Sequence, residues 1–287
     1  MTNRLFTLLI VLCAFLAGRA QERFAPVVSP KCPSSVTFDN ERIDLTVDDR
    51  RERFERELTS MIYSHTGTLS ELKRANWVFP LIKPILKKNG VPEDFIYLAC
   101  IESRLDPTAV SSAKAAGMWQ FMPTTAREYG LEVNDNVDER YDIEKSTEAA
   151  CRYIKSAYAK YGDWMSVAAS YNAGMGRISK ELEAQQEKSA ISLWLPNETM
   201  RYMFRLLADK ALHENAPTFG YALSKDQLYT MPECSIIEVS EKVDDWAAWA
   251  KEHGTNYYSV RRLNPWIRSK SLPNASGKVY KVRIPKA

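Results

Sequence analysis

The sequence predicts a mainly α-helical body followed by a small α+β module. Two observations carry this prediction. Apolar residues recur at three- and four-residue spacing through most of the first 230 residues, whereas residues 234–287 follow the order strand, helix, helix, strand. The 287 residues give room for about two domains. A content of 45% hydrophobic and 26% charged residues is typical of a folded protein.

Residues 1–20 predict a signal peptide. Arg4 precedes an apolar run over residues 5–16, which is shorter than a membrane span. Gly18 and Ala20 are small residues at the positions that a signal peptidase recognises. Cys13 lacks the small preceding residue that lipid attachment needs, so we expect an exported chain in the periplasm or cell envelope. An uncleaved anchor is the alternative.

Residues 21–47 predict an extended, proline-containing arm, and a helical domain is expected over residues 48–230. Asp142 and Asp163 are suitable N-caps, and Gly90 and Gly162 are suitable helix ends. No strand is expected before about residue 235. Helices are expected from about residue 48, over 69–88, 92–105, within 117–130, and over 142–161, 163–171 and 196–213.

The C-terminal module over residues 234–287 differs from the body in both pattern and charge. Strands are expected over 236–239 and 279–284, and helices over 244–253 and 257–263. The module has ten Lys and Arg against five Asp and Glu, whereas residues 21–233 have 27 against 31. This asymmetry favours a polymeric or anionic ligand, with a solvated basic face as the alternative. The net charge of only +3 argues against a nucleic-acid partner.

No metal and no cofactor are expected. The chain has three His and no Cys-x-x-Cys, and it lacks the glycine-rich loops that bind phosphates. Export would leave Cys32, Cys100, Cys151 and Cys234, for which three pairings exist. A bridge between Cys32 and Cys234 stays open, and buried free thiols are an equal reading of the other two.

One carboxylate falls on an apolar stripe. Phe95, Leu98 and Leu105 share one face of the helix expected over 92–105, and Glu102 lies on the same face. Burial raises the pKa of a carboxyl, which a general acid needs near neutral pH. The alternative is a helix-end Glu that pairs with a basic residue such as Arg104.

Two further segments place polar groups among apolar ones. Gln120 lies in a bulky apolar run that begins at Gly117, where a glycine permits a close backbone approach. Tyr171 and Asn172 follow a run of small residues that ends at Gly174. The alternative for the first segment is a buried connection with a satisfied Gln. For the second segment the alternative is a capping Asn beside a core Tyr, which is the default reading of that segment alone.

Together these segments resemble the soluble lytic transglycosylase domain of the lysozyme superfamily, over roughly Trp77 to His213. The long helical lead-in is most similar to the membrane-bound lytic murein transglycosylase D subgroup. The matching stretches are Glu102-Ser103 with Pro107, Ala109 and Ser111; Gly117-Met118-Trp119-Gln120 with Pro123; Ala169-Ser170-Tyr171-Asn172-Ala173-Gly174; and Glu198-Thr199-Met200-Arg201-Tyr202.

The C-terminal module resembles a LysM domain. Leu263-Asn264-Pro265 matches the Leu-Asn-Pro stretch of such modules. Val243-Asp244-Asp245-Trp246 stands where the family has Gly-Asp-Thr-Leu, so this first motif is degenerate. The resemblance implies a LysM-like fold, while retained glycan binding stays open.

The resemblance implies a lysozyme-like helical catalytic domain that acts on peptidoglycan. The expected reaction cleaves the bond between N-acetylmuramic acid and N-acetylglucosamine and leaves a 1,6-anhydro end, with Glu102 as the single general acid and base. The substrate-binding residues implied are Ser103, Met118, Gln120, Tyr171, Asn172 and Tyr202. The alternatives are a hydrolase like goose-type lysozyme and a non-catalytic peptidoglycan-binding protein. Oligomeric state and peripheral association with the envelope stay open.

Overall fold

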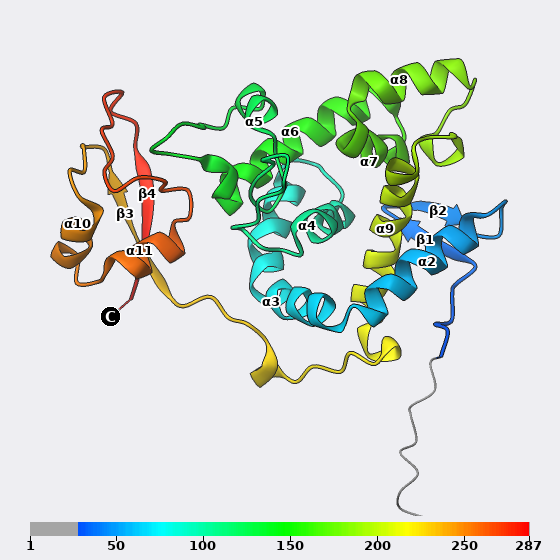
Figure 1. Cartoon of the computed structure of the whole chain (residues 1–287), viewed down its shortest axis with the longest axis horizontal. Helices are drawn as coiled ribbons and strands as arrows, with labels where there is room; N and C mark the ends of the chain where they lie inside the picture. The colour runs from blue at the N-terminus through cyan, green and yellow to red at the C-terminus, as the bar shows by residue number, and fades with distance from the viewer. Residues whose placement is uncertain (1–27, 287) are drawn as a thin grey trace, which may run out of the picture. The chain divides into compact units, whose positions relative to one another are not determined.

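The computed structural model describes residues 28–286, so the predicted signal peptide and the first part of the arm lie outside the described residues. The described chain is mainly helical, as predicted (Figure 1). The helices of the body are α2 (Arg50–Tyr63), α3 (His65–Lys88), α4 (Ile96–Ser103), α5 (Pro123–Glu128), α6 (Ile143–Tyr161), α7 (Trp164–Ala173), α8 (Met175–Ala184) and α9 (Asn197–Glu214).

The predicted caps fix the ends of the central helices. The Asp142 side chain accepts a hydrogen bond from the backbone N–H of Lys145 at the start of α6. Gly162 ends α6 in the left-handed region, and Asp163 then caps α7. The result is a tight corner that packs α6 against α7.

The prediction that no strand precedes residue 235 is wrong. Strands β1 (Ser35–Phe38) and β2 (Glu41–Asp44) form an antiparallel hairpin within the expected extended arm. Val36 and Phe38 are buried on one strand and Ile43 on the other, an alternation of period two. The apolar face of the hairpin belongs to the core of the body, which explains why this short segment is ordered.

Helix α9 lies at the centre of the body. It packs against α2, α4 and α7, and Figure 1 shows it alongside α2. The helix buries most of its length from Thr199 to Leu212. The short helix α4 is likewise buried from Ile96 to Cys100. Packing on both sides therefore holds α4 and α9 in a fixed relation.

The C-terminal segment has the predicted order of elements. Its elements are β3 (Cys234–Val239), α10 (Trp246–Glu252), α11 (Tyr257–Leu263) and β4 (Tyr280–Pro285), with β3 and β4 antiparallel. Trp246 and Val260 are fully buried in a second apolar cluster, to which Val137 and Tyr141 of the body contribute. The domain boundary near residue 234 stays a prediction. Within the described residues, no helix is long and apolar enough to cross a membrane.

Candidate functional site

Glu102 lies in the last turn of α4, where the helix leaves the core. Arg104 and Leu105 both have positive φ, and Arg104 is the left-handed residue that ends the helix. Glu102 is half-buried, in contrast to the fully buried residues of the preceding turn. The negative end of the helix dipole also disfavours a carboxylate at this place.

The Glu102 carboxyl is partnered by a phenol. The Tyr202 hydroxyl on α9 donates a hydrogen bond of 2.5 Å to Glu102 Oε1. Desolvation raises the pKa of Glu102 to about 7, although the Tyr202 hydrogen bond and the charge of Arg205 both lower it. Burial is therefore the dominant influence, and the carboxyl keeps its proton close to neutral pH.

The alternative partner, Arg104, is directed elsewhere. Its guanidinium donates to Ser64 Oγ at 3.3 Å and lies against Gly67. The backbone carbonyl of Arg104 also accepts from Arg74 at 3.1 Å. The helix-end ion pair considered for Glu102 is therefore absent from the hydrogen bonds and ion pairs of residues 28–286.

The segment around Gly117 passes directly over the backbone of Arg140. Gly117 has φ of 78°, and a Cβ atom built there would lie 1.8 Å from the Arg140 carbonyl oxygen. The close approach predicted for this glycine is thus observed. Gln120, with φ of 48°, folds back so that its Nε2 donates to the carbonyls of Gly117 (2.7 Å) and Ala109 (3.2 Å).

Ser103 joins this loop to α4. Its Oγ lies 2.9 Å from the Met118 carbonyl and 3.0 Å from the Ala99 carbonyl, and its single hydrogen can serve either. The Met118 side chain is 1% exposed and packs in the core. Met118 therefore contributes its backbone carbonyl to the site, not its side chain. Ser103 holds the loop next to Glu102, and the lone pairs of its hydroxyl can still accept a hydrogen bond from a ligand.

Tyr171 and Asn172 connect α7 to the same site. The Tyr171 hydroxyl donates to the Trp119 carbonyl at 2.9 Å, and Asn172 Oδ1 accepts from Thr199 Oγ1 at 2.9 Å. Burial, followed by the negative charge of Glu102, raises the pKa of Tyr171. Tyr171 and Gln120 also line a cavity of about 90 Å³. Ser103 and Tyr171 therefore bind the backbone of the loop at residues 118–119, and Asn172 binds the start of α9, the helix that carries Tyr202.

Sequence reasoning missed two charged residues beside the Glu102–Tyr202 pair. Glu198 raises and Arg205 lowers the pKa of Glu102. Glu198, Tyr202 and Arg205 are spaced by four and three residues on α9, which places them on one face of the helix. The sequence shows this spacing, so Glu198 and Arg205 could have been predicted once Tyr202 was chosen as a site residue.

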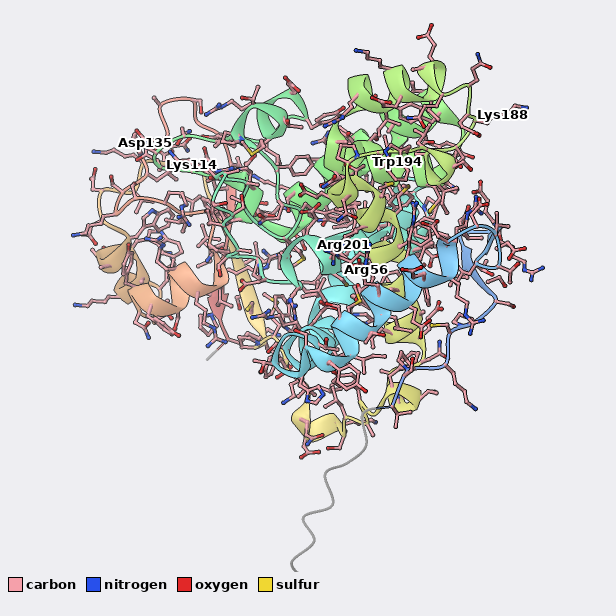
Figure 2. All side chains as sticks on the ribbon, turned by 45° about the vertical axis from the view of Figure 1, so that its right-hand side comes forward. Arg56, Lys114, Asp135, Lys188, Trp194 and Arg201 are labelled. Atoms are coloured by element: carbon pink, nitrogen blue, oxygen red, sulfur yellow. The ribbon has the colours of Figure 1, made fainter. Side chains whose placement is uncertain are left out.

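A buried carboxylate fixes the other side of α9. Glu57 of α2 is 2% exposed, and Arg201 donates to it at 2.6 Å. Arg56 and Arg205 also contact it, at 3.2 and 3.4 Å, and Figure 2 shows Arg56 and Arg201 next to each other. These charges lower the pKa of Glu57 despite its burial. The cluster secures α9, which carries Tyr202.

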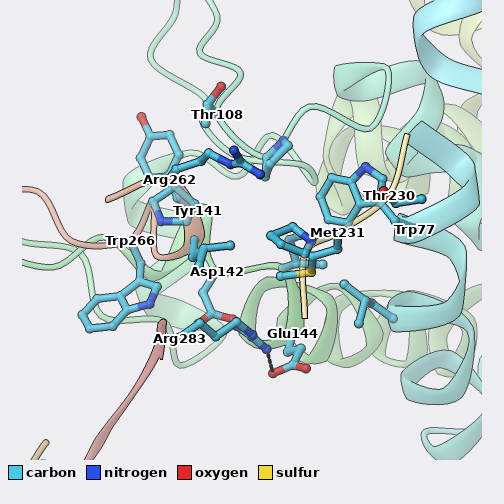
Figure 3. Close-up of a pocket in the computed structure, with 16 residues that line it drawn as sticks. Trp77, Thr108, Tyr141, Asp142, Glu144, Thr230, Met231, Arg262, Trp266 and Arg283 are labelled. Atoms are coloured by element: carbon cyan, nitrogen blue, oxygen red, sulfur yellow. Dashed lines mark ion pairs between the residues drawn. The ribbon is translucent and has the colours of Figure 1, made fainter. Parts of the chain in front are cut away.

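A larger cavity lies away from the Glu102 site. It has a volume of about 280 Å³ and is lined by Trp77, Tyr141 and Trp266, among others, with a 2.8 Å ion pair between Arg283 and Glu144 at its edge (Figure 3). None of the residues predicted for the site lines it. Cavity size alone therefore does not identify the Glu102 site.

The comparisons with known proteins divide the chain into two matched segments. Residues 80–193 match the model described as "Transglycosylase SLT domain", and residues 235–287 match "Soluble lytic transglycosylase C-terminal LysM-like domain". Glu102, Gln120 and Tyr171 fall within the first segment, whereas Tyr202 follows it. The candidate acid therefore lies inside the matched domain.

Individual relatives are similar over different lengths. "Membrane-bound lytic murein transglycosylase D" of Escherichia coli (strain K12) is 31% identical over 257 residues, which cover 86% of this chain and 54% of the relative. "Peptidoglycan transglycosylase gp16" of Escherichia phage T7 is 36% identical over 138 residues, 46% of this chain and 10% of the relative. The chain thus spans about half the length of the first relative. The 70 kDa soluble lytic transglycosylase structure from Escherichia coli aligns with a TM-score of 0.40 at 22% identity, over 52% of this chain and 26% of that chain.

Proposed function

Residues 80–193 of this chain are a transglycosylase SLT domain and residues 235–287 a LysM-like domain, and from this premise we propose that the chain is a peptidoglycan lytic transglycosylase of the cell envelope. It cleaves the β-1,4 bond between N-acetylmuramic acid and N-acetylglucosamine. The observation that carries the proposal is the Glu102 carboxyl, desolvated at the end of a buried helix and held by Tyr202.

Glu102 acts first as an acid. Tyr202 occupies Oε1, so the proton is carried by Oε2 and is given to the glycosidic oxygen. The bond from that oxygen to C1 of the muramic sugar breaks, and positive charge develops at C1, where the sugar's own acetamido group assists. The leaving glucosamine departs as a free hydroxyl.

The Glu102 carboxylate then acts as a base. It takes the proton of the C6 hydroxyl of the same muramic sugar, and the C6 oxygen bonds to C1 to close the 1,6-anhydro ring. Attack within one ring benefits from proximity, provided that the sugar is held in the required shape. Gln120, Tyr171 and Asn172 hold the sugar, and Ser103 orients the leaving group. No water is consumed, and Glu102 ends protonated as it began.

Product masses test this function. Purified sacculi digested by the full chain release fragments that end in anhydro-muramic acid, each lighter by one water than the product of a hydrolase. Fragments at the hydrolytic mass would favour a lysozyme-like reaction. Binding to sacculi without release of fragments would favour a non-catalytic peptidoglycan-binding protein. Pull-down by sacculi also measures the contribution of the LysM-like segment.

The variant Tyr202→Phe tests whether the Tyr202 hydroxyl positions Glu102, because it removes the hydroxyl and keeps the ring that packs in the core. The phenol hydrogen bond lowers the pKa of Glu102, so its loss raises that pKa further. We expect kcat/KM at the optimum to fall about tenfold or more, and the alkaline limb of the pH profile to move to higher pH because the acid form persists longer. A profile measured from pH 5 to 9 checks this. If the alkaline limb of the profile does not shift, Tyr202 has no influence on the pKa of Glu102 and this part of the proposal is wrong.

The variant Glu198→Gln tests whether the reaction uses one carboxylate or two. Glycosidases that hydrolyse with inversion need a second carboxylate to activate water, and Glu198 is the acidic residue whose charge raises the pKa of Glu102. The proposed mechanism does not use it, so we expect turnover within about threefold of the original and an alkaline limb shifted slightly to lower pH. Exposed Glu183 of α8 supplies the control, Glu183→Gln. A loss of about 100-fold or more in Glu198→Gln alone would indicate hydrolysis.

A further inference from the structure

Four side chains of the kinds that bind metal ions meet in the interior, away from Tyr202. They are Glu71 of α3, Cys100 of α4, and Asp209 and His213 of α9, and their ligand atoms all lie within 4.8 Å of one another. Cys100 is fully buried and Asp209 is 1% exposed. Three helices that are distant in sequence thus bring a thiol, an imidazole and two carboxyls to one point.

The distances are close to those of a coordination shell. His213 Nε2 lies 2.9 Å from Glu71 Oε1 and 4.0 Å from Asp209 Oδ1. Bonds of about 2.0–2.3 Å to a tetrahedral zinc ion place its ligand atoms roughly 3.5 Å apart. Side-chain movements of about 1 Å would therefore form the shell. A sulfur, a nitrogen and two oxygens suit zinc and similar transition metals better than calcium or magnesium, which take oxygen ligands.

One unsatisfied atom points to a cation as the ligand. Asp209 Oδ2 is buried and has no hydrogen-bond partner among the described residues. An orphaned carboxyl oxygen in the interior costs free energy, and a bound cation would satisfy it. Glu71, Cys100 and Asp209 also line one cavity of about 220 Å³, which gives an ion room and a path of entry.

The surrounding charges leave the site suited to a cation. Arg201 and Arg205 line the same cavity but contact the Glu57 carboxylate. Arg104 also lines it, and its guanidinium donates to Ser64 Oγ.

We propose that Glu71, Cys100, Asp209 and His213 bind one divalent transition-metal ion of the zinc type. The ion links α3, α4 and α9. Two of these helices connect it to the Glu102–Tyr202 pair, because α4 carries both Cys100 and Glu102 and α9 carries both Asp209 and Tyr202. Its role is to brace the site rather than to contact substrate. The inference is independent of the reaction that the chain catalyses.

Metal titration of the full chain tests this site. Protein stripped with a chelator is titrated with Zn²⁺ by calorimetry and with Co²⁺ by visible spectroscopy, where a thiolate ligand gives a sulfur-to-cobalt charge-transfer band. We expect one equivalent to bind, the band to appear, and Zn²⁺ to raise the Tm. Cys100→Ser abolishes the band and weakens Zn²⁺ binding by at least about 100-fold.

Cys151→Ser is the matched control, because Cys151 is a second fully buried thiol, on α6, outside the cluster. We expect Cys151→Ser to keep the sulfur-to-cobalt band and the affinity for Zn²⁺ of the original chain. Asp209→Asn retains the thiol and the side-chain shape, and we expect it to weaken Zn²⁺ binding by about tenfold or more even if Cys100→Ser fails to fold. No stoichiometric binding by the original chain, or equal binding by both Asp209→Asn and the original, would overturn the proposal in favour of a buried pair that shares a proton.

Discussion

Glu102→Gln is expected to abolish turnover of peptidoglycan while leaving binding to it intact. The amide keeps the size of the carboxyl and can still accept the hydrogen bond from Tyr202, but it can neither give a proton to the glycosidic oxygen nor take one from the C6 hydroxyl. Because one group serves both steps, we expect a loss of at least about 1,000-fold in kcat. Release of anhydro fragments measures turnover, and pull-down by sacculi measures binding.

The same variant has a predicted effect on stability. The pKa of Glu102 is about 7 in the folded chain, above its ordinary value of 4.5. The folded state therefore binds more protons than the unfolded state between these values, and stability falls as the pH rises from 4.5 through 7. The Gln variant lacks this loss. Since each pKa unit corresponds to about 1.4 kcal/mol, we expect its free energy of unfolding at pH 8 to be higher by about 3 kcal/mol.

Chemical denaturation of both proteins at pH 5 and pH 8 checks this expectation. The difference between them should appear at pH 8 and shrink at pH 5, where Glu102 is protonated and uncharged. A Gln variant that is less stable than the original at pH 8 would contradict the expected effect on stability. A folded Gln variant that turns over at close to the original rate would contradict the role given to Glu102.

Gly117→Ala is expected to destabilise the fold strongly. The new Cβ would lie 1.8 Å from the Arg140 carbonyl oxygen, and φ of 78° is itself unfavourable for alanine. Arg140 cannot yield easily, because its side chain is held by Asp138 at 2.7 Å and by the Lys114 and Phe121 carbonyls. We expect a loss of at least about 3 kcal/mol of stability, or failure to fold.

Gly162→Ala is the matched control. Gly162 also has positive φ, 62°, but a Cβ atom there would meet no atom within 4 Å. Only the backbone strain remains, about 1 kcal/mol. Thermal denaturation compares the two variants. Equal losses would mean that the contact with Arg140 adds nothing to the loss of stability and that the loop at Gly117 can move away from Arg140.

Much of the helical fold was predictable because the signals were local. Asp142, Gly162 and Asp163 place the junction of α6 and α7 from side-chain chemistry alone. The β1–β2 hairpin was missed because its strands have only four residues each, and its apolar alternation becomes meaningful when the body covers one face. Helix α8 was not predicted either. It buries only Ile178, so its apolar stripe is narrow.

The candidate site was predictable only in part. The family motifs place Glu102, Gln120, Tyr171 and Tyr202. They do not predict the hydrogen bond that Tyr202 donates to Glu102 across 100 residues of sequence, because helical packing creates that contact. The prediction that no metal binds rested on the absence of closely spaced ligands. In the proposed cluster only Asp209 and His213 are i and i+4 neighbours. Glu71 and Cys100 come from other helices, so no local spacing reveals the set.

Digestion of sacculi in water enriched with heavy oxygen tests the central claim most directly. If Glu102 activates the C6 hydroxyl of the muramic sugar, the new C1–O6 bond uses an oxygen that the sugar already carries. The account predicts anhydro fragments that hold no heavy oxygen. Heavy oxygen incorporated at C1 of the released muramic ends would show that water attacks, and would contradict the transglycosylase mechanism.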